Sequence, residues 1–347
     1  MMEPRTSKEE YARSQPPSGL VRPARVRGRF RNPWPGAEPA TYLDFLRWQV
    51  GRRVRQEVVR GPAWPRPSVA APAFATPRAA TERLLATWVG HSTVLLQIGG
   101  ANVLTDPIWA NRASPLGFAG PRRMVRPGVE LNSLPPIDLV AISHNHYDHL
   151  DEQTVRLLSS RHPEARWIVP LGLGPFVTRL GARNAREMDW WEERDVGAVR
   201  VGCTPAQHHS ARGLGDRGRS LWCGWTFAAG GRRVFFAGDT GHHPEFAAIG
   251  ARFGPFDLTM IPIGAYEPRW FMRSVHMNPE EAVQAHLAAS PPGTPMLAIH
   301  WGTFRLTDEP PGEPPVRAAR AWAAADLAPE TLWVLGHGET RERLPVG

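Results

Sequence analysis

Three histidines and an aspartate fall within six residues near the middle of the chain, and this spacing constrains the fold more than any other feature. The stretch reads Ser143-His-Asn-His-Tyr-Asp-His-Leu-Asp151 and follows the apolar run 137–142. That run predicts a short buried strand. In strand geometry His144 and His146 leave the same side of the chain, so their imidazoles can meet one partner just past a strand end.

Asp148 and His149 come after the chain turns toward a helix predicted over 151–158. They can therefore face a second position near the first, and this arrangement predicts a two-metal site. Imidazole and carboxylate ligands favour zinc, with iron or manganese as alternatives. The remaining ligands of two metals must come from elsewhere in the chain.

The same pattern, an apolar strand that ends in a histidine or a carboxylate, recurs along the sequence. Helices such as the one predicted over 279–289 separate these units, which predicts an α/β sandwich with its site at strand ends. The units are 199–208 ending in His208, 233–239 ending in Asp239, and 295–300 ending in His300.

Two earlier stretches, 86–98 and 101–107, are predicted to open the sheet. In the first, His91 is either a group that supports a metal ligand or a structural histidine. In the second, Asp106 is either a turn former before proline or a carboxylate that supports a metal-bound histidine. The C-terminal segment is predicted to complete the fold with a helix over 316–325, a strand over 331–335 and a turn histidine, His337.

Composition divides the chain into three parts. Residues 1–30 are polar and rich in proline and arginine, which predicts a disordered tail, and 84–347 is predicted to be the globular body. Between them, 31–83 is predicted to hold a helix over 42–60 and a proline-rich linker that pack on the body. That helix is interpreted as packed on the body, with a membrane-surface helix as the alternative. Its apolar stripe is Tyr42, Leu46, Val50, Val54 and Val58.

The net charge of +8 is weak evidence for a nucleic-acid partner. Lys8 is the only lysine and prolines number 36, a pattern typical of GC-rich coding bias, so no nucleic acid is expected. Two cysteines, Cys203 and Cys223, predict a reducing compartment. With no membrane-length apolar run and no signal-peptide core, the protein is expected in the cytoplasm, or peripherally on the inner membrane.

The order of these groups resembles the metallo-β-lactamase-fold hydrolases, and more closely the N-acylphosphatidylethanolamine-hydrolysing phospholipase D family, as a bacterial member. The resemblance runs from Trp88 to Phe304 and extends weakly to Asn32-Pro-Trp34. It is carried by the motif at 143–151 and by Leu134-Pro-Pro-Ile-Asp138, Pro205-Ala-Gln-His208, Gly238-Asp-Thr-Gly241, Ile263-Gly-Ala-Tyr-Glu-Pro-Arg-Trp-Phe-Met272, Asn278-Pro-Glu-Glu-Ala-Val283 and His300-Trp-Gly-Thr-Phe304.

The resemblance implies an αββα sandwich holding two zinc ions. A hydroxide that bridges the metals would attack the phosphorus of an N-acylphosphatidylethanolamine, or a related glycerophospholipid, to give phosphatidate and N-acylethanolamine. Asp148 and Asp239 would act in catalysis, and His276 would contact the phosphate, protonate the leaving alkoxide or serve a structural role. The ligands would be His144, His146 and His208 for one metal, Asp148, His149 and His300 for the other, and Asp239 as the bridge.

A lipid substrate needs an apolar approach, for which Phe118, Trp270, Phe271, Met272 and the helix that begins at Tyr42 are candidates, although such residues also serve as packing. His209 stands where the family has tryptophan, and His242 is a further departure. These changes leave open a hydrolase of a lactone, thioester, amide or other phosphodiester, or a non-catalytic binding module. A peripheral membrane surface and a homodimer are also expected as partners. Arg122, Arg123 and Arg126 form a basic cluster interpreted as either a membrane contact or a solvated face.

Overall fold

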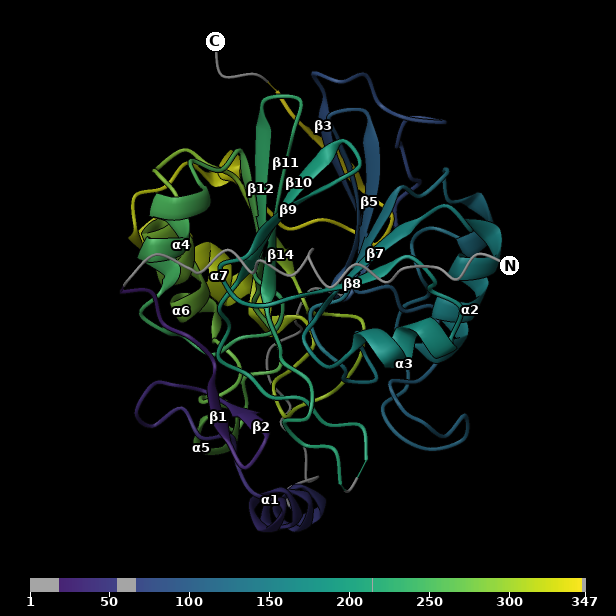
Figure 1. Cartoon of the computed structure of the whole chain (residues 1–347). Coiled ribbons are helices and arrows are strands. Elements are labelled where there is room, and N and C mark those ends of the chain that lie inside the picture. The colour runs from purple at the N-terminus through teal and green to yellow at the C-terminus, as the bar shows by residue number, and fades with distance from the viewer. Residues whose placement is uncertain (1–18, 55–66, 214, 345–347) are drawn as a thin grey trace, which may run out of the picture.

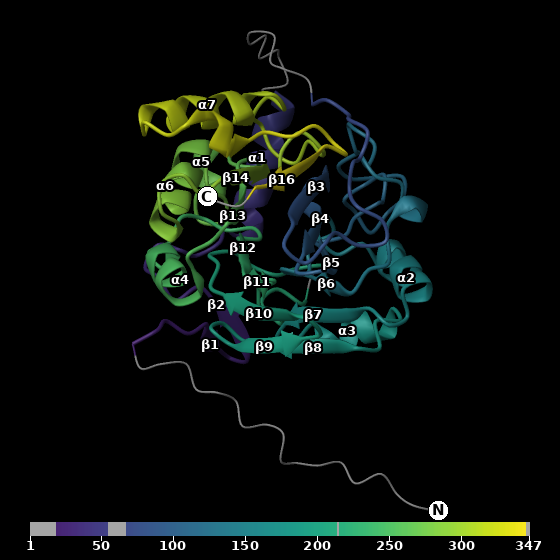
Figure 2. The same ribbon diagram turned by 90° about the horizontal axis from the view of Figure 1, so that it is seen from above.

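Two seven-stranded sheets face each other across an apolar core, and helices cover their outer faces (Figure 1, Figure 2). The computed structural model describes residues 19–54, 67–213 and 215–344. The first sheet has the order β16-β3-β4-β5-β6-β7-β8 and the second the order β15-β14-β13-β12-β11-β10-β9. The predicted αββα sandwich is therefore confirmed.

Each sheet has helices on one side only. The first sheet contains β3 (Leu84–Gly90), β4 (Thr93–Ile98), β5 (Ala101–Thr105), β6 (Leu139–Ala141), β7 (Arg166–Pro170), β8 (Ala185–Met188) and β16 (Thr340–Arg343). The second contains β9 (Glu193–Val196), β10 (Val199–Thr204), β11 (Gly224–Ala229), β12 (Arg232–Phe236), β13 (Leu258–Pro262), β14 (Met296–Ile299) and β15 (Leu332–Trp333). The covering helices are α2 (Glu152–Arg161), α3 (Gly174–Arg179), α4 (Phe246–Phe253), α6 (Pro279–Ala289) and α7 (Glu313–Ala324), and two short 3-10 turns lie at Leu131–Ser133 and Pro329–Thr331.

Strand direction explains why distant histidines can meet. β3 and β5 are each antiparallel to β4, and β6 is parallel to β5, so these three strands end at one edge of the first sheet. In the second sheet β10, β12 and β14 also share a direction. The polar residues that follow all six strands can therefore gather below the two sheets, as the loops do in Figure 1.

The loop that carries the histidine motif at 143–151 ends at the N-terminal cap of a helix. Asp151 caps α2, because its side chain accepts a hydrogen bond from the main-chain N–H of Gln153. The same carboxylate also accepts the N–H of Ala110, 3.1 Å away. Val155 and Leu158 then bury one face of α2 in a smaller core beneath the first sheet. The motif is thus fixed between a buried strand and a capped, packed helix.

The N-terminal segment differs from its prediction. Ala24–Val26 (β1) and Arg29–Arg31 (β2) pair as a hairpin with Phe30 buried, so the predicted disordered tail is wrong for this part of 1–30. Burial of Phe30 in the main core and its N–H bond to Gly218 outweigh the polar composition. Residues 1–18 of that tail lie outside the described residues, as do 55–66 of the predicted helix and linker.

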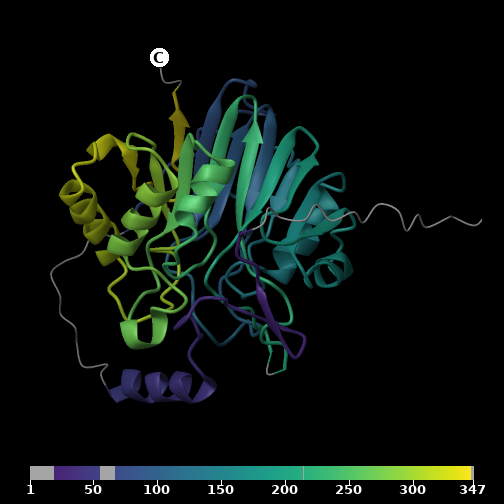
Figure 3. The same ribbon diagram turned by 60° about the vertical axis from the view of Figure 1, so that its left-hand side comes forward.

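Helix α1 (Tyr42–Val54) lies across the lower side of the molecule beside the short α5 (Arg269–Met272), as Figure 3 shows. Its apolar stripe makes little contact with the body, because Tyr42 is 62% exposed and Val50 63%. The buried contact comes from Trp48 instead, whose ring stacks on Phe271 with 5.1 Å between centroids. Among the described helices, none has the length and apolar character that a membrane crossing requires.

Candidate metal centre and pocket

Three imidazoles from two sheets converge below the strands. His144 and His146 follow β6, and His208 follows β10. Nε2 of His144 lies 2.8 Å from Nδ1 of His146, and Nε2 of His208 lies 3.2 Å from that same atom. Ring nitrogens gathered this closely form a donor set for one metal ion. The structure thus brings together the three side chains that the resemblance assigns to one ion.

The second predicted set also meets. Oδ2 of Asp148 lies 3.4 Å from Nε2 of His149 and 3.6 Å from Nε2 of His300. His300 follows β14, in the opposite sheet from the other two. His91 belongs to the same cluster, with its Nε2 2.9 Å from Asp148 Oδ2.

Asp239 stands between the two sets. Its Oδ2 lies 3.0 Å from His149 Nε2 and 3.1 Å from His300 Nε2. The same oxygen lies 4.0 Å from His144 Nε2 and 3.9 Å from His208 Nε2. One carboxylate therefore reaches both clusters, which is the placement expected of a bridging ligand. Bridging itself stays a prediction.

A layer of hydrogen bonds orients the rings. Asp106 accepts from Nδ1 of His149 at 2.7 Å and from the N–H and Oγ of Ser143 at 2.6 Å each. Of its two interpretations, the structure therefore favours the supporting carboxylate. Nδ1 of His208 donates to the Val275 carbonyl at 2.9 Å. Such partners fix the tautomer that leaves the other ring nitrogen free to bind metal.

Backbone strain marks the same strand ends. His91, Asp106 and His300 have φ values of 57°, 32° and 62°, a region that residues with a side chain rarely adopt. Gly238, at φ 61°, precedes the bridging position, and a Cβ there would lie 2.9 Å from the Cβ of Ser143. Only glycine lets the two loops approach this closely. The fold thus holds unfavourable conformations where the polar groups converge.

The electrostatics of the cluster favour cations. Burial opposes a charge on His149, yet Asp239, Asp148 and Asp106 together raise its pKa well above the usual value. The pKa of His300 likewise rises to about 9 despite burial, through Asp239 and Asp148. Because the field of these carboxylates stabilises positive charge in a buried place, a divalent cation suits it.

The other imidazoles are held neutral, the form that binds metal. Burial, and then the neighbouring His208, lowers the pKa of His146 to about 3. Burial also lowers the pKa of His208 to about 4. Several buried atoms have no hydrogen-bond partner among the described residues, namely His149 Nε2, Asp239 Oδ1, His276 Nδ1 and both ring nitrogens of His300. Unpaired buried donors and acceptors facing one another fit a metal centre, so this donor set suits the predicted ions.

An apolar pocket of about 630 Å³ opens onto this cluster. His146, His208 and His276 lie at its polar end, with His276 Nδ1 4.0 Å from Asp239 Oδ2. His209 lines it too, where the resemblance expected tryptophan. The remaining wall is formed mainly by α1 and the α5 region, including Tyr42, Phe45, Trp48, Phe271, Met272 and Val275. Tyr42 belongs to the apolar stripe of α1, whereas Phe45 and Trp48 reach the pocket from positions outside that stripe.

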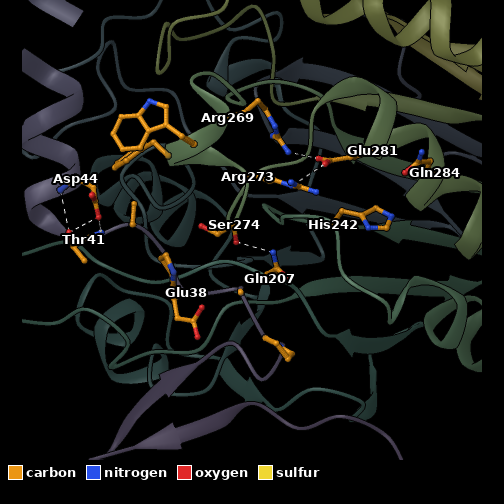
Figure 4. A pocket seen from close by; sticks show the side chains of 16 residues that line it. Glu38, Thr41, Asp44, Gln207, His242, Arg269, Arg273, Ser274, Glu281 and Gln284 are labelled. Carbon is orange, nitrogen blue, oxygen red and sulfur yellow. Dashed lines mark hydrogen bonds and ion pairs between the residues drawn. The ribbon is translucent and has the colours of Figure 1, made fainter. Parts of the chain in front are cut away.

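A second pocket of about 790 Å³ adjoins the first and is mostly polar (Figure 4). Trp270 and His242 line this pocket and not the apolar one, whereas Phe271 lines both. Phe118, a predicted substrate contact, is 81% exposed and belongs to neither lining. Arg123 of the expected basic cluster is buried, and donates to the carbonyls of Ile108 and Ala110. A surface role is therefore wrong for that residue.

This fold, with ligand-type side chains at the strand ends, defines a metal-dependent hydrolase of the metallo-β-lactamase type. Residues 101–301 match the family model described as the beta-lactamase superfamily domain, and the chain belongs to that family. The predicted superfamily and enzyme class are thus confirmed. A structure of a possible metal-dependent hydrolase from Veillonella parvula has the same fold, with a TM-score of 0.59 at 18% identity over 77% of this chain and all of that one.

Two relatives extend the comparison. An uncharacterized protein of Mycobacterium tuberculosis is 44% identical over 290 residues, which cover 82% of this chain and 76% of that protein. N-acyl-phosphatidylethanolamine-hydrolyzing phospholipase D 1 of Caenorhabditis elegans is also 44% identical, over 233 residues. That match covers 64% of this chain and 65% of the nematode protein.

Proposed function

We propose that this enzyme hydrolyses the phosphodiester of N-acylphosphatidylethanolamine, or of a related glycerophospholipid, to phosphatidate and N-acylethanolamine. The observation that carries the proposal is the apolar pocket whose polar end is the histidine and aspartate cluster. A substrate with long acyl chains and a charged phosphate matches both ends. The name of the nematode relative supports the same substrate class.

Two zinc ions are the cofactor that we propose. His144, His146 and His208 would hold one, Asp148, His149 and His300 the other, and Asp239 both. When bound, two such cations lower the pKa of a water molecule and stabilise negative charge on phosphate oxygens. Nitrogen and oxygen donors of this kind favour zinc, while iron and manganese accept them as well.

We assign His276 to the leaving group. Hydrolysis forms a bond from a water oxygen to phosphorus and breaks the bond from phosphorus to the head-group oxygen, and that alkoxide needs a proton. His276 lies at the end of the pocket with an unpaired Nδ1. Burial lowers the pKa of its imidazole and favours the neutral form, so His276 would relay a proton to this oxygen as the water gives one up.

We further propose that the substrate enters from a phospholipid surface. Tyr42 and Phe45 line the pocket from α1, and Leu43, 75% exposed, continues the apolar surface outward. A helix that presents apolar side chains beside a lipid-sized pocket suits the interface of a bilayer. Cys203 and Cys223 are free thiols, which favours the cytoplasmic face of the inner membrane.

The test is product analysis by mass spectrometry. Zinc-loaded protein is incubated with N-acylphosphatidylethanolamine in mixed micelles prepared in ¹⁸O-labelled water, beside the Asp239→Asn variant. We expect N-acylethanolamine and phosphatidate that carries the label, with at least about a hundredfold loss in the variant because it lacks the shared carboxylate. If zinc-loaded wild type yields neither product, the lipid assignment is overturned. Turnover of lactones or thioesters instead would place the enzyme in the carbonyl-hydrolase class.

A further inference from the structure

Asn32, in the N-terminal segment, forms hydrogen bonds with the main chain of His208, a metal-ligand candidate 176 residues away. Its Oδ1 accepts the N–H of His208 at 3.2 Å and the indole N–H of Trp222 at 3.1 Å. Its Nδ2 donates to the carbonyls of His208 at 3.0 Å and Ala37 at 2.7 Å. One amide group thus binds both main-chain polar groups of His208.

The loop that carries His208 needs a hydrogen-bond partner from outside the sheet. Strand β10 ends at Thr204, and His208 follows in a loop where only Gln207 makes a bridge, to Gly241. Within the described residues, the main chain of His208 forms its hydrogen bonds with Asn32 alone. Because a buried main-chain group without a partner costs free energy comparable to a lost hydrogen bond, the amide helps to fix where His208 lies in this loop.

The ring of His208 has a separate anchor, the Val275 carbonyl. Two anchors, one on the main chain and one on the ring, place Nε2 3.2 Å from His146 Nδ1. We propose that Asn32 is a positioning residue of the metal centre, so that the N-terminal segment outside the family region 101–301 is part of the site. The inference rests on the proposed ligand role of His208 and is independent of the lipid substrate.

The competing explanation is that Asn32 only tethers the N-terminal segment. Other bonds already do this: the guanidinium of Arg29 donates to the carbonyls of Gly215 and Arg217, and Phe30 donates its N–H to Gly218. Arg29 therefore offers a matched control. Its replacement removes two long-range bonds from the same segment without touching His208.

The experiment compares wild type, Asn32→Asp and Arg29→Gln as full-length chains. Asn32→Asp keeps the size and the accepting oxygen but sets an oxygen in place of the amide that faces two carbonyls. Metal-free protein is titrated with Co²⁺ and followed by its visible d–d absorption, which reports ligand geometry as well as affinity. The melting temperature of each metal-free protein measures any general loss of stability.

We expect wild type to bind two Co²⁺ equivalents, and Arg29→Gln to bind both with the same affinity as wild type. In Asn32→Asp one equivalent keeps its affinity and the other weakens about 10- to 100-fold, the usual cost of losing a group behind a ligand, with an altered spectrum. Asn32→Ala, which adds no charge, must show the same selective loss if the aspartate variant does not fold.

Three results would overturn the inference. If the Asn32 variants bind both ions with wild-type affinity, the hydrogen bonds of Asn32 to His208 are dispensable. Equal weakening in Arg29→Gln would indicate simple tethering. Failure of wild type to bind two ions would remove the ligand role of His208 and the proposed metal chemistry with it, whereas the first two results leave the proposed function intact.

Discussion

The metal centre and the outer end of the pocket are built in opposite ways. In the centre, His144, His149 and Asp239 are buried at strand ends and ordered by hydrogen bonds or by close contact with one another. At the outer end, Tyr42 and Leu43 come from one helix and stand mostly in solvent. The first region fixes atoms relative to one another, and the second offers apolar surface.

This difference indicates a division of labour. Buried polar groups hold positions to within fractions of an ångström, as metal chemistry requires. An exposed apolar helix makes no such demand, since acyl chains and lipid surfaces are fluid partners. Changes in the centre should therefore act on metal binding and on all substrates alike. Changes at the outer end should act on lipid substrates alone.

Apart from changes to the ligand candidates themselves, a large effect is expected from Asp106→Asn. Asp106 has no exposed surface and accepts three hydrogen bonds, from Ser143 and from His149. The variant keeps the size but loses the charge that orients His149. We expect about 10- to 100-fold weaker binding of one metal ion in a zinc titration, and a similar loss of kcat/KM on every substrate.

Asp138→Asn is the matched control for that prediction. Asp138 forms an ion pair at the surface with Arg78, 2.6 Å away, and also accepts a hydrogen bond from the main-chain N–H of Asn102. It should keep both metal affinities, because its contacts lie away from the cluster. Full metal affinity in Asp106→Asn would contradict the idea that the rings depend on this buried layer.

The sequence predicted the metal centre better than the pocket, and local spacing explains why. Four of the seven ligand candidates lie within six residues, and the others each end an apolar strand, so local spacing marked them as candidates, and the resemblance assigned them to the two metals. Helix α6 was predicted over 279–289, the range that the structure gives. Its Asn278 and Glu281 form a capping box, a signal that is local to the sequence.

The pocket depends on contacts that no local pattern encodes. Trp48 meets Phe271 across more than 200 residues, and Asn32 reaches His208 in the same way. An exposed aromatic such as Phe118 therefore looked as suitable as Phe271. The hairpin at Ala24–Arg31 was missed for a related reason, since its stability comes from Phe30 entering the core and not from strand-like composition.

Phe271→Ala should separate the two regions by substrate. Its ring stacks on Trp48 and lines the pocket, and truncation removes apolar wall without touching a ligand candidate. Loss of one aromatic contact costs about 1.5–3 kcal/mol, so kcat/KM for the micellar lipid should fall about tenfold or more. Hydrolysis of the small, soluble bis(p-nitrophenyl) phosphate should remain close to wild type.

Phe118→Ala provides the comparison for that variant. Phe118 lies outside both pocket linings, so neither substrate should respond. If the lipid reaction falls in Phe118→Ala and stays intact in Phe271→Ala, then the apolar pocket is not where the acyl chain binds. Zinc content should be equal in both variants.

The smallest effect is expected at the outermost surface, in the double variant Leu43→Ser with Val50→Ser. Both side chains are exposed on α1, so the fold should lose little stability. Sedimentation with anionic phospholipid vesicles should show binding weaker by a few-fold to about tenfold, because partial burial of each side chain in the interface contributes about 1 kcal/mol or less. Leu157→Ser, at an exposed position of α2 on another side, should bind vesicles as wild type does. Unchanged vesicle binding in the double variant, together with a changed mass in light scattering, would identify the α1 surface as a contact between two copies of the chain. The outer end would then be a fixed interface, and the contrast with the metal centre would lie in chemistry alone and not in rigidity.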